Sequence, residues 1–186
     1  MEKVKILVLF GFMSLHTLAQ ESIVKEGLLR TQLTLSPSKM LNDNLSYFYL
    51  HGNLEGYVSD KISISGEGYL FLGRTSFYAD IQSFKHNHSV FFGANYHFIK
   101  NNHDVYLGIQ PGVAYTQVKM LRGMNEQYTS TNPLFSSVVG YNYYINNIFH
   151  FFVQTRLILG KHLANDAKSL NEIRFSAGLG FNLNTK

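Results

Sequence analysis

The sequence predicts an all-β protein, an eight-stranded antiparallel up-and-down transmembrane β-barrel. Three observations support this prediction: a leader typical of exported proteins, eight segments in which apolar and polar residues alternate, and connections that are alternately long and short. Alternation is typical of a β-strand with one apolar face, because successive side chains point to opposite faces of a sheet.

Residues 1–19 have the features of a cleaved secretory signal peptide. Two lysines open the segment, an apolar run follows at 6–10, and Ala19 provides a cleavage position. The alternative is a membrane anchor, but the run is short against the roughly 20 apolar residues that a helical span needs. We therefore expect an outer-membrane β-barrel domain over residues 20–186.

The composition fits a sheet with one face in lipid. Charged residues make up 15% of the chain, against about 25% in ordinary soluble domains. The formal net charge of +4 is modest and spread along the chain, so no nucleic-acid partner is indicated. Cysteine is absent, so no disulfide framework holds the fold.

Four strands are predicted in the first half of the mature chain. The first alternates most weakly, while the second and third keep the pattern across a tight turn. In the second strand, Leu50 and Leu54 share one face, and His51 and Glu55 share the other. The predicted ranges are 24–36, 45–58, 61–73 and 88–100.

Four more strands are predicted in the second half. The last alternates most clearly, because every second residue from Ile173 to Leu183 is apolar and the residues between are polar or glycine. Pro111 in the fifth strand removes a backbone donor, so we expect a bulge or local irregularity there. The predicted ranges are 104–118, 134–145, 148–161 and 171–183.

The connections support a membrane barrel. Transmembrane barrels have short periplasmic turns and long extracellular loops, and this alternation fits a chain that starts in the periplasm. A secreted soluble barrel, which could bind a ligand, is the alternative, but it would need faces and loops richer in Lys and Glu. The tight connections are 59–61, 101–103 and 146–147, and the long ones are 37–44, 74–87, 119–133 and 162–170. Aromatic residues expected in the periplasmic girdle are Tyr57, Phe98, Tyr143, Phe149 and Phe181.

On these features the chain resembles the OmpA/OmpX-type small eight-stranded outer-membrane β-barrel proteins. The resemblance covers essentially the whole mature chain and is one of pattern, without a diagnostic motif. It implies a porin-like protein of the Gram-negative bacterial cell outer membrane, inserted by the barrel-assembly machinery and in contact with outer-membrane lipids and lipopolysaccharide. A monomer is expected. Members often end in an aromatic residue, whereas here 182–186 follow Phe181.

The interior of an eight-stranded barrel is just wide enough for side chains to fill it. Charges in such a narrow lumen must be paired, because an isolated buried ion costs several kcal/mol. We therefore predict that Glu/Arg pairs close the lumen, and a narrow pore for small solutes is the alternative. The predicted lumen charges are Glu26, Arg30, Glu55, Glu67, Arg156, Glu172 and Arg174.

The long loops offer a second candidate site. Loop 74–87 is apolar for an exposed segment, so it is expected either to fold over the barrel mouth or to bind an extracellular protein. The loops also carry a slight excess of Lys and Arg, including Lys168, which suits lipopolysaccharide phosphates or is ordinary solvated charge. The residues of the predicted loop patch are Phe77, Tyr78, Ile81 and Phe84.

No metal site, cofactor or catalytic site is predicted. His51 and His97 are expected to point inward, but no spacing brings together the three or four ligands that a metal needs. Ser89 beside His88 has no evident carboxylate partner, and the nucleophile motif G-x-S-x-G is absent. The predicted role is therefore structural or surface-interacting and not enzymatic, with a lipid-modifying enzyme as a further alternative.

Overall fold

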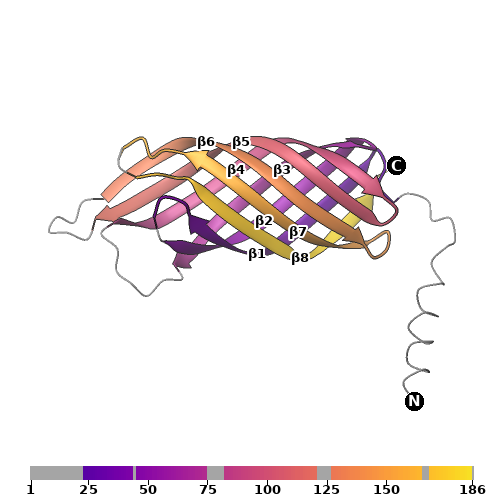
Figure 1. Cartoon of the computed structure of the whole chain (residues 1–186), viewed down its shortest axis with the longest axis horizontal. Coiled ribbons are helices and arrows are strands. Elements are labelled where there is room, and N and C mark those ends of the chain that lie inside the picture. Colours follow the sequence, from indigo (N-terminus) through magenta and orange to yellow (C-terminus); the bar gives the residue numbers. More distant parts are fainter. Residues whose placement is uncertain (1–22, 44, 75–81, 121–126, 165–167, 186) are drawn as a thin grey trace, which may run out of the picture.

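A computed structural model describes residues 23–43, 45–74, 82–120, 127–164 and 168–185. Eight antiparallel strands follow one another around a closed barrel, and β8 pairs with β1 to complete it (Figure 1). The predicted fold class is confirmed. The strands are β1 (Leu28–Met40), β2 (Ser46–Ser59), β3 (Ile62–Arg74), β4 (Gln82–Lys100), β5 (His103–Met120), β6 (Gln127–Tyr144), β7 (Phe149–Gly160) and β8 (Glu172–Asn184). The predicted signal peptide, 1–19, lies outside the described residues. Within the described ranges, no helix has the length and hydropathy of a membrane span.

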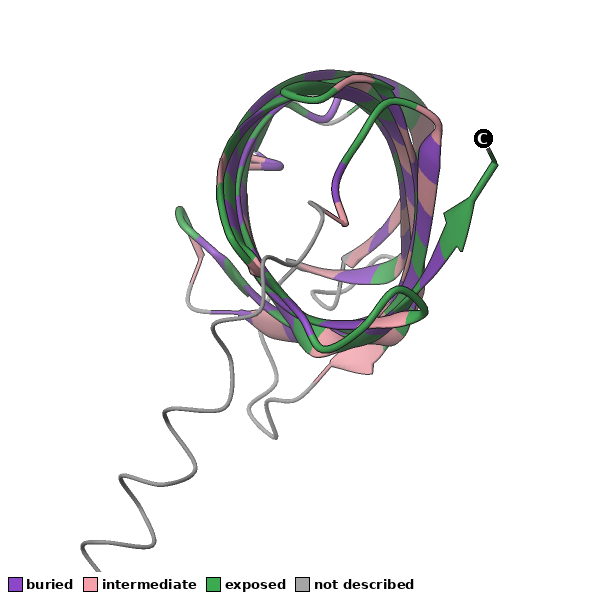
Figure 2. Ribbon diagram, turned by 90° about the vertical axis from the view of Figure 1, so that its right-hand side faces the viewer, coloured by how far each residue is buried: buried purple, intermediate pink, exposed green. Residues whose placement is uncertain are grey.

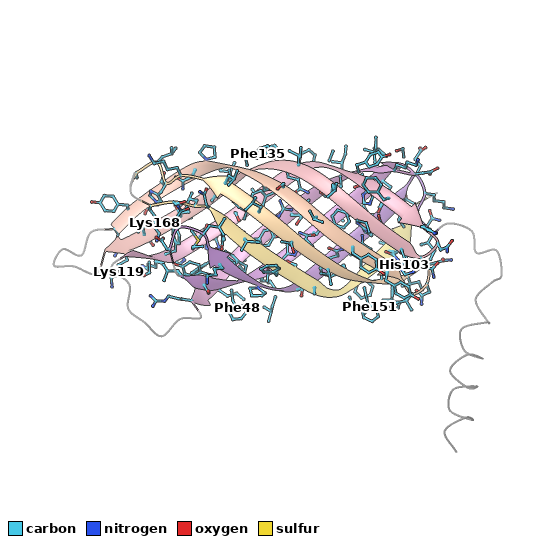
Figure 3. All side chains as sticks on the ribbon, viewed as in Figure 1. Phe48, His103, Lys119, Phe135, Phe151 and Lys168 are labelled. Atoms are coloured by element: carbon cyan, nitrogen blue, oxygen red, sulfur yellow. The ribbon has the colours of Figure 1, made fainter. Side chains whose placement is uncertain are left out.

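The two faces of the wall differ in polarity. Along β6, every second residue from Leu134 to Tyr144 is buried and the residues between them are exposed. Seen along its axis, the barrel is a closed ring in which buried and exposed positions alternate (Figure 2). The side chains of Phe48, Phe135 and Phe151 point away from the barrel (Figure 3). Apolar residues outside and polar residues inside are the reverse of a soluble core and are typical of a membrane barrel.

Three strands extend further than the sequence predicts. β1 continues to Met40, β4 already begins at Gln82, and β6 begins at Gln127. The pairing of β5 with β6 continues to Lys119 opposite Gln127. Residues 127–132 contain no aliphatic side chain, so this extension of β6 lacks the apolar alternation that predicts a strand, although its backbone is paired with β5.

The predicted irregularity at Pro111 is an interruption and not a bulge. Pairing of β4 with β5 is present at Phe91 opposite Gly112 and at Ala94 opposite Ile109, with the same register on both sides of the gap. The proline nitrogen has no hydrogen to donate, so the ladder lapses locally without an inserted residue. The register shift between these strands lies near Phe84 instead.

The prediction of the aromatic girdle is wrong for one residue, Tyr57. Phe98, Tyr143 and Phe181 are exposed near the ends of their strands, as expected. Tyr57 is buried, because it shares the inward face of β2 with Glu55.

Apolar side chains gather inside the barrel at both ends. At the end with short turns, Val24 and Leu28 pack with Tyr57 and Tyr144. A larger cluster lies toward the end with long connections and contains Met40, Leu45, Tyr47, Tyr49, Tyr69, Phe84, Phe91, Ala114, Val118, Leu134, Ile158 and Leu170. The charged part of the lumen therefore has apolar packing on both sides.

Candidate functional site: the charged lumen

Three charged clusters are stacked along the lumen. β2 passes all three, with Glu55 in the lower cluster, His51 in the middle cluster and Tyr49 in the upper cluster. The lower cluster lies nearest the short turns. The Arg, His, Asp and Glu residues of the lower cluster are Arg30, Glu55, His97 and Asp104. In the middle cluster they are His51, Glu67 and Arg156. In the upper cluster they are Glu172 and Arg174. All nine side chains are buried.

Arg30 organises the lower cluster. Its Nε donates to Glu55 at 3.1 Å, and its Nη2 forms an ion pair with the same carboxylate. Its Nη1 donates to Asp104 at 3.0 Å and to the Tyr144 hydroxyl at 2.8 Å. The guanidinium therefore uses its planar set of donors on two carboxylates from different strands.

His97 lies between the same two carboxylates. Its Nδ1 is 2.9 Å from Asp104 Oδ1, and its Nε2 is 3.2 Å from Glu55 Oε1. A neutral imidazole has only one N–H donor, whereas the imidazolium has two. Because both ring nitrogens lie against carboxylates, the imidazolium form is favoured. Its positive charge balances one of the two carboxylates, since Arg30 alone balances only the other.

Ser63, His97 and Asp104 follow the order of a hydrolytic triad. The Ser63 hydroxyl lies 2.8 Å from His97 Nε2, on the opposite side of the ring from Asp104. However, the Ser63 hydroxyl donates to Glu55, and all three side chains are fully buried. A nucleophile must give its proton to the histidine and reach a substrate carbonyl. The observed contacts give Ser63 a hydrogen-bonding role in the cluster.

The middle cluster is centred on Glu67. Arg156 Nη2 is 2.5 Å from Glu67 Oε1 and also donates to Gln110 Oε1 at 2.9 Å. The second oxygen of Glu67 accepts from Gln154 at 2.7 Å and lies 2.9 Å from His51 Nε2. Both carboxylate oxygens are thus saturated, which a buried charge requires.

Amide side chains connect the lower and middle clusters. Asn95 donates to Glu55 at 2.8 Å and to Ser65 at 3.1 Å. Gln110 donates to the same Ser65 hydroxyl at 2.7 Å and to Glu67 at 3.1 Å. The two clusters therefore form one hydrogen-bonded network across the barrel interior.

The upper cluster joins two residues of β8. Glu172 and Arg174 are two apart and share the inward face, and Arg174 Nη2 donates to Glu172 Oε2 at 2.7 Å. The guanidinium carbon lies 3.9 Å from the Tyr49 ring centroid and 4.5 Å from that of Tyr69. Stacking of a desolvated cation on aromatic faces adds to the ion pair.

The structure places six of the seven predicted lumen charges in these clusters. Glu26 lies elsewhere: it is exposed and its backbone nitrogen donates to Asp60 in the first short turn. Because β1 begins at Leu28, residue 26 precedes the alternation that would have directed it inward.

Only one of the four predicted loop-patch residues lies in the described part of the chain. Phe77, Tyr78 and Ile81 lie outside the described residues. Phe84 is only 4% exposed and packs on Tyr47 inside the barrel. The extension of β4 to Gln82 places Phe84 on an inward-facing strand position and not in a loop.

Several network members were absent from the predicted set. Asp104 is the most important of these. The alternation along β5 indicates its inward position, because it shares one face of the strand with Tyr106 and Gln110. His51 and His97 were expected to point inward, but their carboxylate partners could not be assigned without the register. Among the described residues, no group of three or more His, Cys, Asp or Glu could hold a metal ion.

Comparisons with known proteins identify the fold. No protein-family model and no curated protein sequence matches the chain. Neisserial surface protein A is similar, with 12% identity and a TM-score of 0.61 over 84% of this chain and 96% of that one. The outer membrane protein OprG from Pseudomonas aeruginosa has 8% identity and a TM-score of 0.65 over 89% and 100%. The Yersinia pestis attachment invasion locus protein Ail, in complex with the heparin analogue sucrose octasulfate, has 14% identity and a TM-score of 0.58 over 85% and 99%. The chain therefore has the fold of the small eight-stranded outer-membrane β-barrels.

Proposed function

We propose that this protein is a non-enzymatic barrel of the bacterial outer membrane, with a structural or surface-interaction role and a lumen closed by Arg–carboxylate pairs. The observation that supports this proposal most directly is the stack of three buried charge clusters. Each guanidinium in it has a carboxylate partner on the same or another strand. A wall this narrow leaves no separate channel once such side chains fill it.

Apolar packing at both ends supports closure independently. Val24, which precedes β1, is buried against the inward-facing side chains near the short turns. Phe84, Leu134 and Leu170 are buried at the opposite end. An ion would have to cross apolar regions as well as the charged clusters, at a high desolvation cost.

Single-channel conductance of the mature chain in a planar bilayer tests the closed lumen. Heat-modifiable migration in gels confirms folding before reconstitution, and we expect an inserted protein without discrete openings. Reproducible openings would instead establish the narrow pore for small solutes, with Arg30, Glu67 and Arg156 as its first mutational targets. Turnover of lipid A or phospholipid by the folded protein would contradict the non-enzymatic role.

The surface role is proposed for the rim at the long connections. Lys39 on β1, Lys85 on β4 and Lys161 after β7 are exposed there. Figure 3 shows Lys119 at the same end and His103 at the other. Cations at this level suit the phosphates of lipopolysaccharide, with each lysine near an anionic surface contributing about 1 kcal/mol. The sucrose octasulfate complex of Ail is a precedent for a ligand on this fold.

A set of lysine substitutions tests this surface role. Changing Lys39, Lys85 and Lys161 together to glutamine is expected to reduce lipopolysaccharide retained through purification in detergent. The matched control changes Lys61 and Lys100, which are exposed at the short-turn end, and should retain it. Equal retention in both variants would remove the rim from the proposal.

Assembly and partners complete the proposal. We infer insertion by the barrel-assembly machinery and a monomeric state, which depletion of that machinery and mass measurement in detergent test. Binding of an extracellular protein through the long connections is proposed as a second surface interaction. Unchanged adhesion after shortening of the connection between β3 and β4 would exclude that connection.

A further inference from the structure

The two described flanks of the β7–β8 connection, residues 161–164 and 168–171, pair with each other at the barrel mouth. Lys161 forms a β-bridge with Ser169, and the His162 nitrogen donates to the Lys168 carbonyl at 3.1 Å. Leu170 is buried in the large apolar cluster. These flanks are therefore packed onto the barrel interior and are not a solvated loop.

Side chains tie these flanks to other strands. Lys168, predicted to be a solvated loop cation, is buried, forms an ion pair with Asp43 and lies 5.1 Å from the Phe84 ring centroid. The Ser169 hydroxyl donates to Asn42 Oδ1 at 2.8 Å. The connection after β7 is thus fastened to the connection after β1 and to β4.

His162 is the exception in this well-bonded region. Its side chain is fully buried, yet within the described part of the chain neither ring nitrogen has a hydrogen-bond partner. Among the described residues, the charged groups at this position are Lys168 on the same connection and, paired with it, Asp43. From β6 the neighbouring group is the uncharged Asn132, which accepts from the Leu163 nitrogen at 2.7 Å. A buried polar group without partners destabilises the closed arrangement by about 1–3 kcal/mol.

We propose that His162 is a proton-operated latch, whose protonation in acid releases the 161–164 and 168–171 flanks and opens the extracellular mouth. An imidazolium would be buried without an acceptor and beside the Lys168 ammonium, so the closed mouth disfavours it. In the open mouth the same ring is hydrated and binds the proton freely. The latch concerns the mouth alone and is independent of whether the charged clusters below conduct.

The direction of the pH effect follows from proton linkage. Burial, and then the charge of Lys168, lower the pKa of His162 from its ordinary value of 6.5. The open form therefore binds more protons than the closed form, and closure weakens as the pH falls below the ordinary value. Above that value His162 is neutral in both forms, so its titration no longer opposes closure.

Thiol labelling can measure the opening, because the chain has no cysteine of its own. Ser38→Cys places a near-isosteric reporter on the inward face of β1, where Ser38 is 5% exposed. Thr129→Cys is the reference, since Thr129 is exposed on the polar extension of β6, outside both flanks, and reports the intrinsic effect of pH on the reagent. Each reporter is introduced alone into the full mature chain in lipid vesicles and labelled with a membrane-impermeant methanethiosulfonate.

We expect the labelling rate of Ser38→Cys, divided by that of Thr129→Cys, to rise about tenfold between about pH 7.5 and pH 5. His162→Leu cannot be protonated, and it should keep the ratio low at both pH values. Asp43→Asn breaks the ion pair between Asp43 and Lys168, and it should raise the ratio at both pH values. The second variant shows that the reporter detects an open mouth.

Three results would overturn the latch. The first is a ratio that does not change with pH in the wild-type background. The second is an acid-induced rise that persists in His162→Leu, which would assign the titration to Asp43 or another carboxylate. The third is a low ratio in Asp43→Asn, which would show that the ion pair does not hold the mouth closed.

Discussion

Arg30 on β1 and Asp104 on β5 are joined across the lumen by a 3.0 Å hydrogen bond between the guanidinium and the carboxylate. The two strands are not neighbours in the barrel, so this contact spans the interior and does not follow the wall. Both side chains are fully buried. The pair therefore connects opposite sides of the barrel, and it requires the register and curvature that bring β1 to face β5.

Replacing Asp104 with asparagine should destabilise the barrel while keeping the shape of the side chain. Arg30 would keep Glu55 as a partner but lose the second carboxylate, and His97 would lose the negative charge beside its Nδ1. Removing one partner from a buried ion pair costs roughly 3–5 kcal/mol, and the surviving Glu55 contact places the expected loss near about 3 kcal/mol. Urea unfolding in detergent measures it, with circular dichroism as the signal because the chain lacks tryptophan.

Asp60→Asn is the matched control for this experiment. Asp60 is exposed in the turn between β2 and β3, so its substitution should change the free energy of unfolding by no more than about 0.5 kcal/mol. Equal stability of the Asp104 and Asp60 variants would mean that the cross-lumen pair does not stabilise the fold.

Arg156→Ala should be more harmful than removal of both charges of its pair. Glu67 would be left buried with no guanidinium, at a cost of roughly 3–5 kcal/mol. Adding Glu67→Gln removes the uncompensated charge while keeping hydrogen-bonding groups near His51 and Gln154. The double variant should therefore recover part of the lost free energy of unfolding in a double-mutant cycle. A double variant less stable than Arg156→Ala would contradict the pairing.

The alternation of residues predicts which face a side chain occupies, but not its height in the barrel. Arg156 and Glu67 lie on predicted inward faces and meet in the middle cluster. The association of Arg30 with Asp104, by contrast, depends on the register of five successive strands, which no local pattern records. Phe84 was misplaced for a related reason. Residues 82–87, at the start of β4, alternate too weakly between apolar and polar to predict that the strand begins at Gln82.

Gly140 provides a test of packing in the lumen. It faces inward from β6, and a Cβ built on it would lie 2.1 Å from the Tyr106 ring. Tyr106 is fully buried and donates to Gln154 at 2.8 Å, so the ring cannot move without disturbing the middle cluster. Gly140→Ala should therefore lower the free energy of unfolding by about 1–3 kcal/mol, the usual range for overpacking.

Gly68 is the matched control for Gly140. It faces outward from β3, and a Cβ at this position would have no atom within 4 Å. Gly68→Ala should leave stability unchanged or raise it by up to about 1 kcal/mol, because alanine restricts the unfolded chain. If both alanine variants unfolded alike, the tight contact at Tyr106 would not limit the packing of the lumen.

The final prediction concerns the outer wall. Ile109 on β5 is 61% exposed and lies in the middle of its strand, where the wall of a membrane barrel meets lipid. Ile109→Arg should make folding into lipid vesicles less favourable by roughly 2–4 kcal/mol, the cost of a cation near the bilayer midplane. Thr129→Arg lies on the polar extension of β6 and should cost at most about 1 kcal/mol, as expected near the interface. A soluble barrel would tolerate both substitutions, because an exposed arginine in water carries no desolvation cost. The difference between the two positions, measured in vesicles and not in water, therefore decides whether this apolar wall faces lipid.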